Sequence, residues 1–197
     1  MKSITRLYLT LLLLTAATPF TIAQSRLQSF DDRALEYLEA HRTPGQTKAW
    51  LLISNTNDYV NVAIPAGLLV AGIIDHNPDM RQNALYVASS TATTFLVNTL
   101  IKKLVRRPRP FISNVHLTAV YQPSSTSFPS GHTSSAFSSA TALARAYPKW
   151  YVIAPAFLWS GAVGYSRMYL GVHYPSDVTA GALLGAGTAF GLGFIRP

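Results

Sequence analysis

Five apolar stretches, separated by polar or proline-containing segments, occupy most of the chain after Asp58. Several are shorter than the ~20 residues that a helix needs to cross a bilayer, and they are rich in Ser, Thr, Ala and Gly. Small residues let helices approach closely in lipid, and residues 181–185, Gly-Ala-Leu-Leu-Gly, have the required spacing. The pattern predicts an all-α fold, a multi-span transmembrane helical bundle, with a soluble helical bundle as the alternative. The predicted spans are Tyr59 to Ile74, Asn83 to Ile101, Thr133 to Tyr147, Trp150 to Tyr165 and Val178 to Ile195.

Residues 1–23 have the order of a secretory signal peptide. Lys2 and Arg6 precede an apolar run, and small residues then lead to an expected cleavage site after Ala23. An uncleaved first membrane helix is the alternative, and in both cases the chain from Gln24 onward is expected to be exported. We therefore divide the chain into this N-terminal segment, an exported segment of residues 24–58, and a helical core of residues 59–197.

The exported segment contains one amphipathic pattern. From Phe30 to His41, apolar residues recur at the spacing of one helical face, and acidic residues lie elsewhere. The apolar positions are Phe30, Ala34, Leu35 and Leu38. This pattern predicts a surface or interfacial helix.

Composition and charge support a membrane protein with an anionic partner. Of the 197 residues 49% are hydrophobic and 12% are charged, whereas a soluble domain has about 25% charged residues. The chain has no cysteine, which excludes disulfides and thiolate metal sites. The net charge is +8, and a cluster of cations lies within residues 102–109. Because no nucleic-acid-binding pattern accompanies it, we expect no nucleic acid partner.

The distribution of loops gives an orientation. If Gln24 begins outside, residues 75–82, residues 148–149 and the C-terminus are cytoplasmic, and Arg81 and Lys149 fit the positive-inside rule. The same count places all the motifs described below on the outer face. The sequence thus predicts a bacterial inner membrane protein whose active site faces the periplasm.

The first motif is the basic run from Lys102 to Pro110. Its two prolines should end the second span, so that Lys102 lies in the last helical turn and Arg109 in an extended stretch. Such a run can bind an anion, but cations at a membrane surface also act as snorkelling anchors. The second basic group, Lys103, Arg106 and Arg107, has two interpretations: contact with a lipid headgroup or interfacial anchoring.

The second motif is Pro129-Ser130-Gly131-His132, directly before the third span. Proline, serine and glycine before a helix predict a start whose free N–H groups and positive dipole end can hold an anion. His132 stands at the edge of this cradle. A helix cap with an incidental histidine is the alternative.

The third motif runs from Ser166 to Asp177 and contains Arg167 and His173. Pro175 favours a helix start, and Asp177, four residues after His173, is expected to accept a hydrogen bond from its ring. A carboxylate on one ring nitrogen leaves the other unprotonated as a nucleophile. An ordinary surface ion pair is the alternative, but polar residues that border membrane spans usually have a function.

Together the three motifs resemble the type 2 phosphatidic acid phosphatase family. The matches are Lys, six residues, Arg-Pro; Pro-Ser-Gly-His; and Ser-Arg, five residues, His, three residues, Asp. They occur in order and cover about residues 102–177. This family includes bacterial lipid phosphatases, secreted acid phosphatases and vanadium haloperoxidases.

The resemblance implies a metal-independent phosphatase with no cofactor. It implies that His173 attacks phosphorus to form a phosphohistidine, that Asp177 orients it and that His132 protonates the leaving alkoxide. The implied phosphate-binding residues are Lys102, Arg109, Ser130, Gly131 and Arg167. The implied substrates are membrane lipid phosphates: lipid A phosphate, undecaprenyl pyrophosphate, phosphatidylglycerophosphate or phosphatidic acid.

Alternative functions remain at this stage. The signal peptide and short spans also fit a secreted, soluble acid phosphatase of the same family. A haloperoxidase would hold vanadate in the same pocket, and a noncatalytic lipid-binding protein needs only the anion cradle. The motifs leave His41, His76 and His116 as loop or surface residues, and Tyr121 with the serine-rich residues 124–127 as a loop near the substrate entrance.

Overall fold

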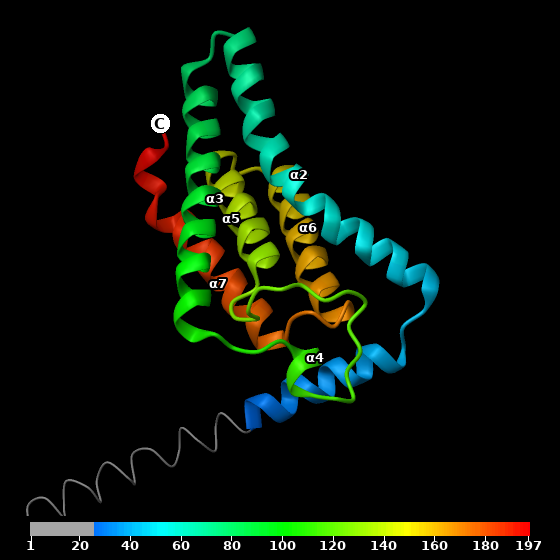
Figure 1. Cartoon of the computed structure of the whole chain (residues 1–197). Coiled ribbons are helices and arrows are strands. Elements are labelled where there is room, and N and C mark those ends of the chain that lie inside the picture. The colour runs from blue at the N-terminus through cyan, green and yellow to red at the C-terminus, as the bar shows by residue number, and fades with distance from the viewer. Residues whose placement is uncertain (1–25) are drawn as a thin grey trace, which may run out of the picture.

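Figure 1 shows the protein as a computed structural model that describes residues 26–197. This part of the chain is helical, without strands, and the predicted signal peptide lies outside it. A first helix covers residues 26–40. The helices that follow are α2 (Pro44–Ile74), α3 (Pro78–Val105), α4 (Pro110–Ser113), α5 (Gly131–Ala146), α6 (Trp150–Tyr169), α7 (Pro175–Gly191) and the 3₁₀ turn η1 (Gly193–Ile195).

The long helices α2 and α3 form a hairpin that extends beyond the other helices (Figure 1). The Thr43 side chain caps α2, so the helix begins at Pro44 and not at Tyr59, and the predicted boundary at residue 58 lies inside it. Buried polar residues Ser54 and Asn57 lower the hydrophobicity of this early part. Hydrophobic patterning alone therefore misses the first turns, although tertiary packing keeps them helical. The helix bends near its middle in Figure 1, and Pro65 lies inside it.

Helix α5 lies at the centre of the bundle and packs against α3, α6 and α7. Its closest neighbour is α7, because two glycines of α7 face the α5 backbone. A Cβ atom added at Gly185 would lie 2.1 Å from the Ser134 carbonyl oxygen, and one at Gly181 would lie 2.7 Å from the Ser130 carbonyl oxygen. The small-residue spacing predicted at residues 181–185 is thus confirmed as a close helix contact.

Three segments of the described chain are long and apolar enough to cross a membrane: Pro44–Ile74, Pro78–Ser113 and Pro175–Ile195. Five were predicted. Helix α5 has 16 residues, below the ~20 that a span needs, and α6, at 20 residues, contains several aromatic and polar residues. The two helices instead pack among the three long segments. The protein is a multi-span helical membrane protein.

The first helix lies near α4, at the end of the bundle away from the α2–α3 turn (Figure 1). Leu35 is buried against Leu117 and Tyr174, and Asp31 is buried as well. Phe30, predicted on the apolar face, is instead 57% exposed. The helix therefore docks through a mixed face of leucine and aspartate, and its aromatic edge points outward.

Candidate active site

The three sequence motifs meet at one end of the bundle. The first lies where α3 ends and α4 begins, the second at the start of α5, and the third at the turn from α6 to α7. Contacts between them are direct, since the backbone N–H of Ser130 donates to the Asp177 carbonyl oxygen and Arg109 Nη1 donates to the Val172 carbonyl oxygen at 2.7 Å. The prediction that all three share one face of the molecule is borne out by this geometry.

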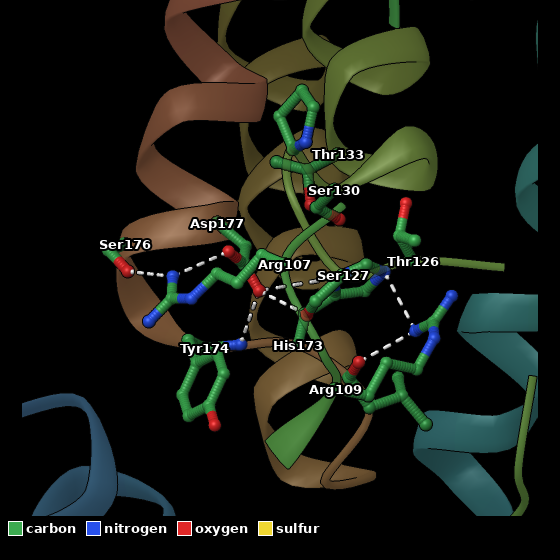
Figure 2. A network of polar contacts seen from close by, with 12 residues as sticks. Arg107, Arg109, Thr126, Ser127, Ser130, Thr133, His173, Tyr174, Ser176 and Asp177 are labelled. Atoms are coloured by element: carbon green, nitrogen blue, oxygen red, sulfur yellow. Dashed lines mark hydrogen bonds and ion pairs between the residues drawn. The ribbon is translucent and has the colours of Figure 1, made fainter. Parts of the chain in front are cut away.

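His173 is 2% exposed and lies between an arginine and a carboxylate. Arg109 Nη1 is 3.3 Å from its Nε2 atom. Because a guanidinium only donates, Nε2 accepts and the ring proton lies on Nδ1. Nδ1 faces Ser127 Oγ at 3.5 Å and Asp177 Oδ2 at 3.6 Å (Figure 2). The lone pair of the His173 ring is thus on Nε2, the nitrogen that faces Arg109.

The predicted direct hydrogen bond from His173 to Asp177 is replaced by a longer contact. The 3.6 Å separation of Nδ1 and Oδ2 exceeds hydrogen-bond length. Ser127 donates its hydroxyl proton to the same Oδ2 atom, and the Tyr174 backbone N–H donates to it at 3.0 Å. Sequence reasoning assigned Ser127 only to an entrance loop, and no local pattern marks a serine that reaches a carboxylate 50 residues further along the chain.

Backbone carbonyl groups hold two of the predicted phosphate-binding cations. Lys102 Nζ donates to the carbonyl oxygens of Thr126 and Ser127, and Arg109 Nε donates to that of Ser125 at 2.6 Å. All these carbonyls belong to the loop before α5. The loop therefore holds both cations in the site through neutral acceptors, which leave their charges in place.

Arg167, the third cation, is 2% exposed. It donates through Nη1 to the Ser54 and Tyr121 hydroxyls, and Nε has no hydrogen-bond partner within residues 26–197. An unpaired buried N–H is costly, which gives this arginine capacity for an anion. Tyr121, assigned to the entrance loop from sequence, contacts the site through this hydrogen bond.

The start of α5 differs in part from the predicted anion cradle. Ser130 is fully buried, its hydroxyl pairs with Thr133 at 2.8 Å, and its N–H is bound to Asp177. Ser130 therefore holds α5 against α7 in this arrangement. Gly131 and His132 occupy the first turn, where N–H groups lack acceptors within the helix and can bind an anion.

Both histidines are poor proton acceptors in this site. Burial lowers the pKa of His173 to about 3; the Asp177 carboxylate opposes the shift, and the Arg167 and Arg109 charges add to it. Burial, and after it the Arg167 charge, lowers the pKa of His132 to about 4, against the opposing charge of Asp58. Both rings are therefore neutral near pH 7.

Arg107 does not lie where a residue that contacts a lipid headgroup or anchors the protein at the interface was predicted. Its guanidinium lies between two buried carboxylates, with Nη1 2.7 Å from Asp177 Oδ1 and Nη2 2.9 Å from Asp31 Oδ2. The sequence suggested an exposed cation because Arg107 belongs to a basic run. Its carboxylate partners lie 70 and 76 residues away, beyond the reach of any local pattern.

A cleft of about 1410 Å³ connects the start of α5 with the apolar flanks of α2 and α3. At one end it is lined by Gly131, His132 and Lys102, and at the other by Leu69, Leu85 and Phe95. Lys103 and Arg106 also line it, a position compatible with either predicted role, headgroup contact or interfacial anchoring. The cleft thus joins a cationic end to a hydrocarbon-like wall.

The remaining histidines of the sequence analysis are not part of the site. His41, His76 and His116 are all exposed, as predicted for loop or surface residues. In the part of the chain that the structure describes, no group of three or more His, Cys, Asp or Glu residues is arranged to hold a metal ion.

Known proteins resemble this chain in sequence and in fold. It is 38% identical over 111 residues to a decaprenylphosphoryl-5-phosphoribose phosphatase from Mycobacterium tuberculosis, covering 55% of this chain and 59% of the relative. It is 31% identical over 121 residues to an undecaprenyl-diphosphatase from Bacillus subtilis, covering 61% of each. The chain thus spans about three fifths of the length of these curated relatives.

One solved structure, a transmembrane PAP2 type phosphatidylglycerolphosphate phosphatase from Bacillus subtilis, is similar over nearly the whole chain. The TM-score is 0.72 at 28% sequence identity, and the match covers 96% of this chain and 94% of that one. The family model of the PAP2 superfamily matches residues 83–194, which include all three motifs. The family predicted from the motifs is therefore confirmed, and the chain belongs to the PAP2 superfamily.

Proposed function

We propose that the protein is a metal-independent phosphatase that removes phosphate from a membrane lipid phosphate or pyrophosphate. The observation that carries the proposal is the cleft, because its cationic end contains His132 and Lys102 and its other end is apolar and formed by helices of membrane-spanning length. A phosphorylated headgroup and its hydrocarbon tail need this combination of surfaces. A soluble phosphoester would need only the cationic end.

The substrate class follows from the same cleft and from the relatives. Two relatives are named for decaprenylphosphoryl-5-phosphoribose and undecaprenyl diphosphate, and the solved structure is named for phosphatidylglycerolphosphate. These names support a lipid-linked phosphate. Undecaprenyl pyrophosphate, phosphatidylglycerophosphate, lipid A phosphate and phosphatidic acid are therefore the candidate substrates.

In the proposed first step, Nε2 of His173 attacks phosphorus as the bond to the lipid oxygen breaks. His132 gives its proton to the leaving oxygen, which belongs to an alkoxide for a lipid monophosphate and to the remaining lipid phosphate for a pyrophosphate, and the phosphoryl group stays on His173. Lys102, Arg109 and Arg167 stabilise the equatorial oxygens together with the N–H groups at Gly131 and His132. Arg109 already donates to Nε2, so it lies beside the atom that phosphorus must reach.

In the second step, water attacks the phosphohistidine. His132, now neutral, takes a proton from this water, inorganic phosphate leaves, and Nε2 of His173 regains its lone pair. His132 must be protonated in the first step although its pKa is low, and a bound phosphate dianion supplies the negative charge that favours this proton. Binding of the substrate therefore favours the protonated His132 that the first step requires.

The proposed location is the bacterial inner membrane, with the site at the periplasmic face. Arg81, in the first turn of α3, and Lys149, directly before α6, lie at the other end of the bundle, where the positive-inside rule expects cytoplasmic cations. This distribution of charge supports an outward-facing site.

Phosphate release by the purified protein from a panel of the four lipids and one soluble phosphoester tests the proposal. We expect turnover of at least one lipid, unchanged in excess chelator, and no turnover by His173→Ala. Strict dependence on added Mg²⁺, or equal catalytic efficiency on the soluble ester and every lipid, would contradict it.

A further inference from the structure

Arg107 joins the active-site carboxylate to a helix outside the matched family domain. One guanidinium nitrogen, Nη1, lies 2.7 Å from Asp177 Oδ1, and the other, Nη2, lies 2.9 Å from Asp31 Oδ2 (Figure 2 shows the Asp177 side). Asp177 belongs to α7 and Asp31 to the helix of residues 26–40, which precedes the matched range 83–194. A single side chain thus bridges two elements that are far apart in sequence.

The bridge has further contacts that fix its geometry. Asp31 Oδ1 accepts the backbone N–H of Ser176 at 3.0 Å, and Arg107 Nη1 donates to the Ser176 hydroxyl at 2.7 Å. Arg107 Nη2 also donates to Gln28 Oε1 at 2.9 Å, and its guanidinium lies 4.0 Å from the centre of the Tyr174 ring. The first turn of α7 is therefore bonded to both Asp31 and Arg107 through Ser176.

Charge makes the bridge necessary. The side chains of Asp31 and Asp177 are both 0% exposed, whereas that of Arg107 is 20% exposed. Within residues 26–197 Arg107 is the only lysine or arginine in an ion pair with either carboxylate. Two buried carboxylates without a cation are strongly unfavourable. Arg107 therefore supplies the positive charge that offsets these two carboxylates.

The two oxygens of Asp177 have separate partners. Oδ1 contacts Arg107, and Oδ2 faces His173 and accepts from Ser127 and the Tyr174 N–H. Rotation of the carboxylate would break both sets at once. The contact on Oδ1 thus sets the direction in which Oδ2 points.

We propose that Arg107 is a positioning residue for the reaction, which holds the Asp177 carboxylate toward His173 and, through Asp31, couples this pair to docking of the N-terminal helix. The inference rests on the proposed function, because it assigns His173 as the nucleophile. It goes beyond that function by giving the N-terminal helix a part in catalysis.

The positive charge of Arg107 also has a chemical consequence. The groups that face His173 are Asp177, Ser127, Arg109 and, at longer range, Arg167. Arg107 reaches the ring only through Asp177 and offsets part of that negative charge. Without Arg107, Asp177 should attract a proton onto His173 more strongly, so that the nucleophile is lost at a higher pH.

The experiment measures kcat, KM and the acid limb of kcat/KM between pH 4 and 7 on the best lipid substrate in detergent. The test variants are Arg107→Gln, Arg107→Lys and Asp31→Asn. Arg33→Gln and Asp32→Asn are the matched controls, because they make the same charge changes at positions of the N-terminal helix, and neither residue bonds to Arg107. Thermal unfolding of each purified variant reports on folding.

For Arg107→Gln we expect kcat to fall roughly 10–100-fold, the loss typical when a residue that orients a metal ligand through a hydrogen bond is removed, because Arg107 orients Asp177 in the same indirect way; KM should change less than about 3-fold. The acid limb of its kcat/KM profile should shift to higher pH, into the range between pH 4 and 7. Arg107→Lys keeps the positive charge, so its acid limb should match that of the wild-type protein. Its kcat should lie between those of the wild-type protein and Arg107→Gln. Asp31→Asn should lower kcat without moving the limb upward, and both controls should match wild type.

Wild-type kcat in Arg107→Lys and Asp31→Asn would overturn the inference, and these two variants decide it if Arg107→Gln does not fold. A folded Arg107→Gln with low kcat and an unmoved acid limb would reduce Arg107 to a structural residue and would also overturn it. Inactivity of the wild-type protein on every lipid would instead contradict the proposed function. The two failures are therefore distinguishable.

Discussion

The two histidines of the site have opposite surroundings. His173 is in the turn before α7, 2% exposed, and fixed by Arg109 on one ring nitrogen and by Asp177 and Ser127 on the other. His132 is in the first turn of α5 and lines the cleft that continues to the apolar surfaces of α2 and α3. A nucleophile reacts faster when its ring is held in one orientation. A group that protonates the leaving lipid must instead lie in the cleft that binds the lipid. The difference therefore supports the proposed attacking role of His173 and the proposed protonating role of His132.

Replacement of His173 by Ala is the most severe test of this contrast. The variant lacks the atom that would form the bond to phosphorus, so turnover of every phosphoester should fall to the background of the assay. Phosphate release from lipid and from p-nitrophenyl phosphate measures it. Substantial turnover of either substrate by His173→Ala would remove the distinction between the two histidines.

Replacement of His132 by Ala should depend on the leaving group. A general acid contributes roughly 10²–10⁴-fold, and we expect a loss of this size in kcat on a lipid phosphate, whose alkoxide needs a proton. The loss should be much smaller for formation of the phosphoenzyme from p-nitrophenyl phosphate, because nitrophenolate leaves without one. Equal losses in this step for both substrates, measured by rapid mixing, would contradict the assigned role.

Narrowing the cleft should separate lipid from soluble substrates. Ala92→Phe places a bulky group on the α3 wall of the cleft, and kcat/KM on a long-chain lipid should fall roughly 10–200-fold, the range for a misfit in an apolar pocket. Activity on p-nitrophenyl phosphate should be retained. Leu100→Phe, at an exposed position of α3 outside the cleft, is the control. A loss on both substrates would mean that the cleft does not serve the lipid tail.

The acid limb of the pH profile tests the depressed pKa of His173. The pKa of about 3 lies below the ordinary value, so the ring stays neutral as pH falls from 7 to 5, and kcat/KM should not show an acid loss in this range. An ordinary histidine, with a pKa of about 6.5, would be only about 3% neutral at pH 5. A limb centred near pH 6.5 that persists with several substrates would contradict the buried environment of His173.

The smallest expected effect concerns the spacing between the helices that carry the two halves of the site. Gly185→Ala forces α7 away from the Ser134 carbonyl of α5, and overpacking of this kind costs typically about 1–3 kcal/mol. The melting temperature in detergent should fall. Gly187→Ala is the matched control, since a Cβ there meets nothing within 4 Å. Equal melting temperatures for both variants would show that the close contact is not needed.

The sequence predicted which motif residues meet at the site better than it predicted the contacts that hold them there. Lys102, Arg109, Arg167 and His173 are near one another, as the motifs implied, because each motif lies where a helix begins or ends. The partners of Arg107 and Ser127 were missed, since both contacts join segments 50 or more residues apart. Ser130 was assigned to phosphate, but its hydroxyl bonds to Thr133.

In the fold, too, features set by nearby residues were predicted, and features set by contacts between distant segments were missed. Pro78 and Pro175, each at the start of its helix, mark boundaries that local rules predict. The start of α2 was placed too late, because its early turns contain polar residues, among them the buried Ser54 and Asn57, that interrupt the apolar pattern. Polar residues that are buried by tertiary contacts carry no hydrophobic signal in the sequence.

The central claim is that phosphate passes through a covalent bond to His173. The most direct measurement mixes the protein with ³²P-labelled lipid phosphate, quenches in alkali, in which phosphohistidine survives, and counts label retained on the protein. We predict label on the wild-type protein, located on the peptide that contains His173, and none on His173→Ala. Label retained on His173→Ala, or turnover of the wild-type protein with no label at any time, would contradict the account.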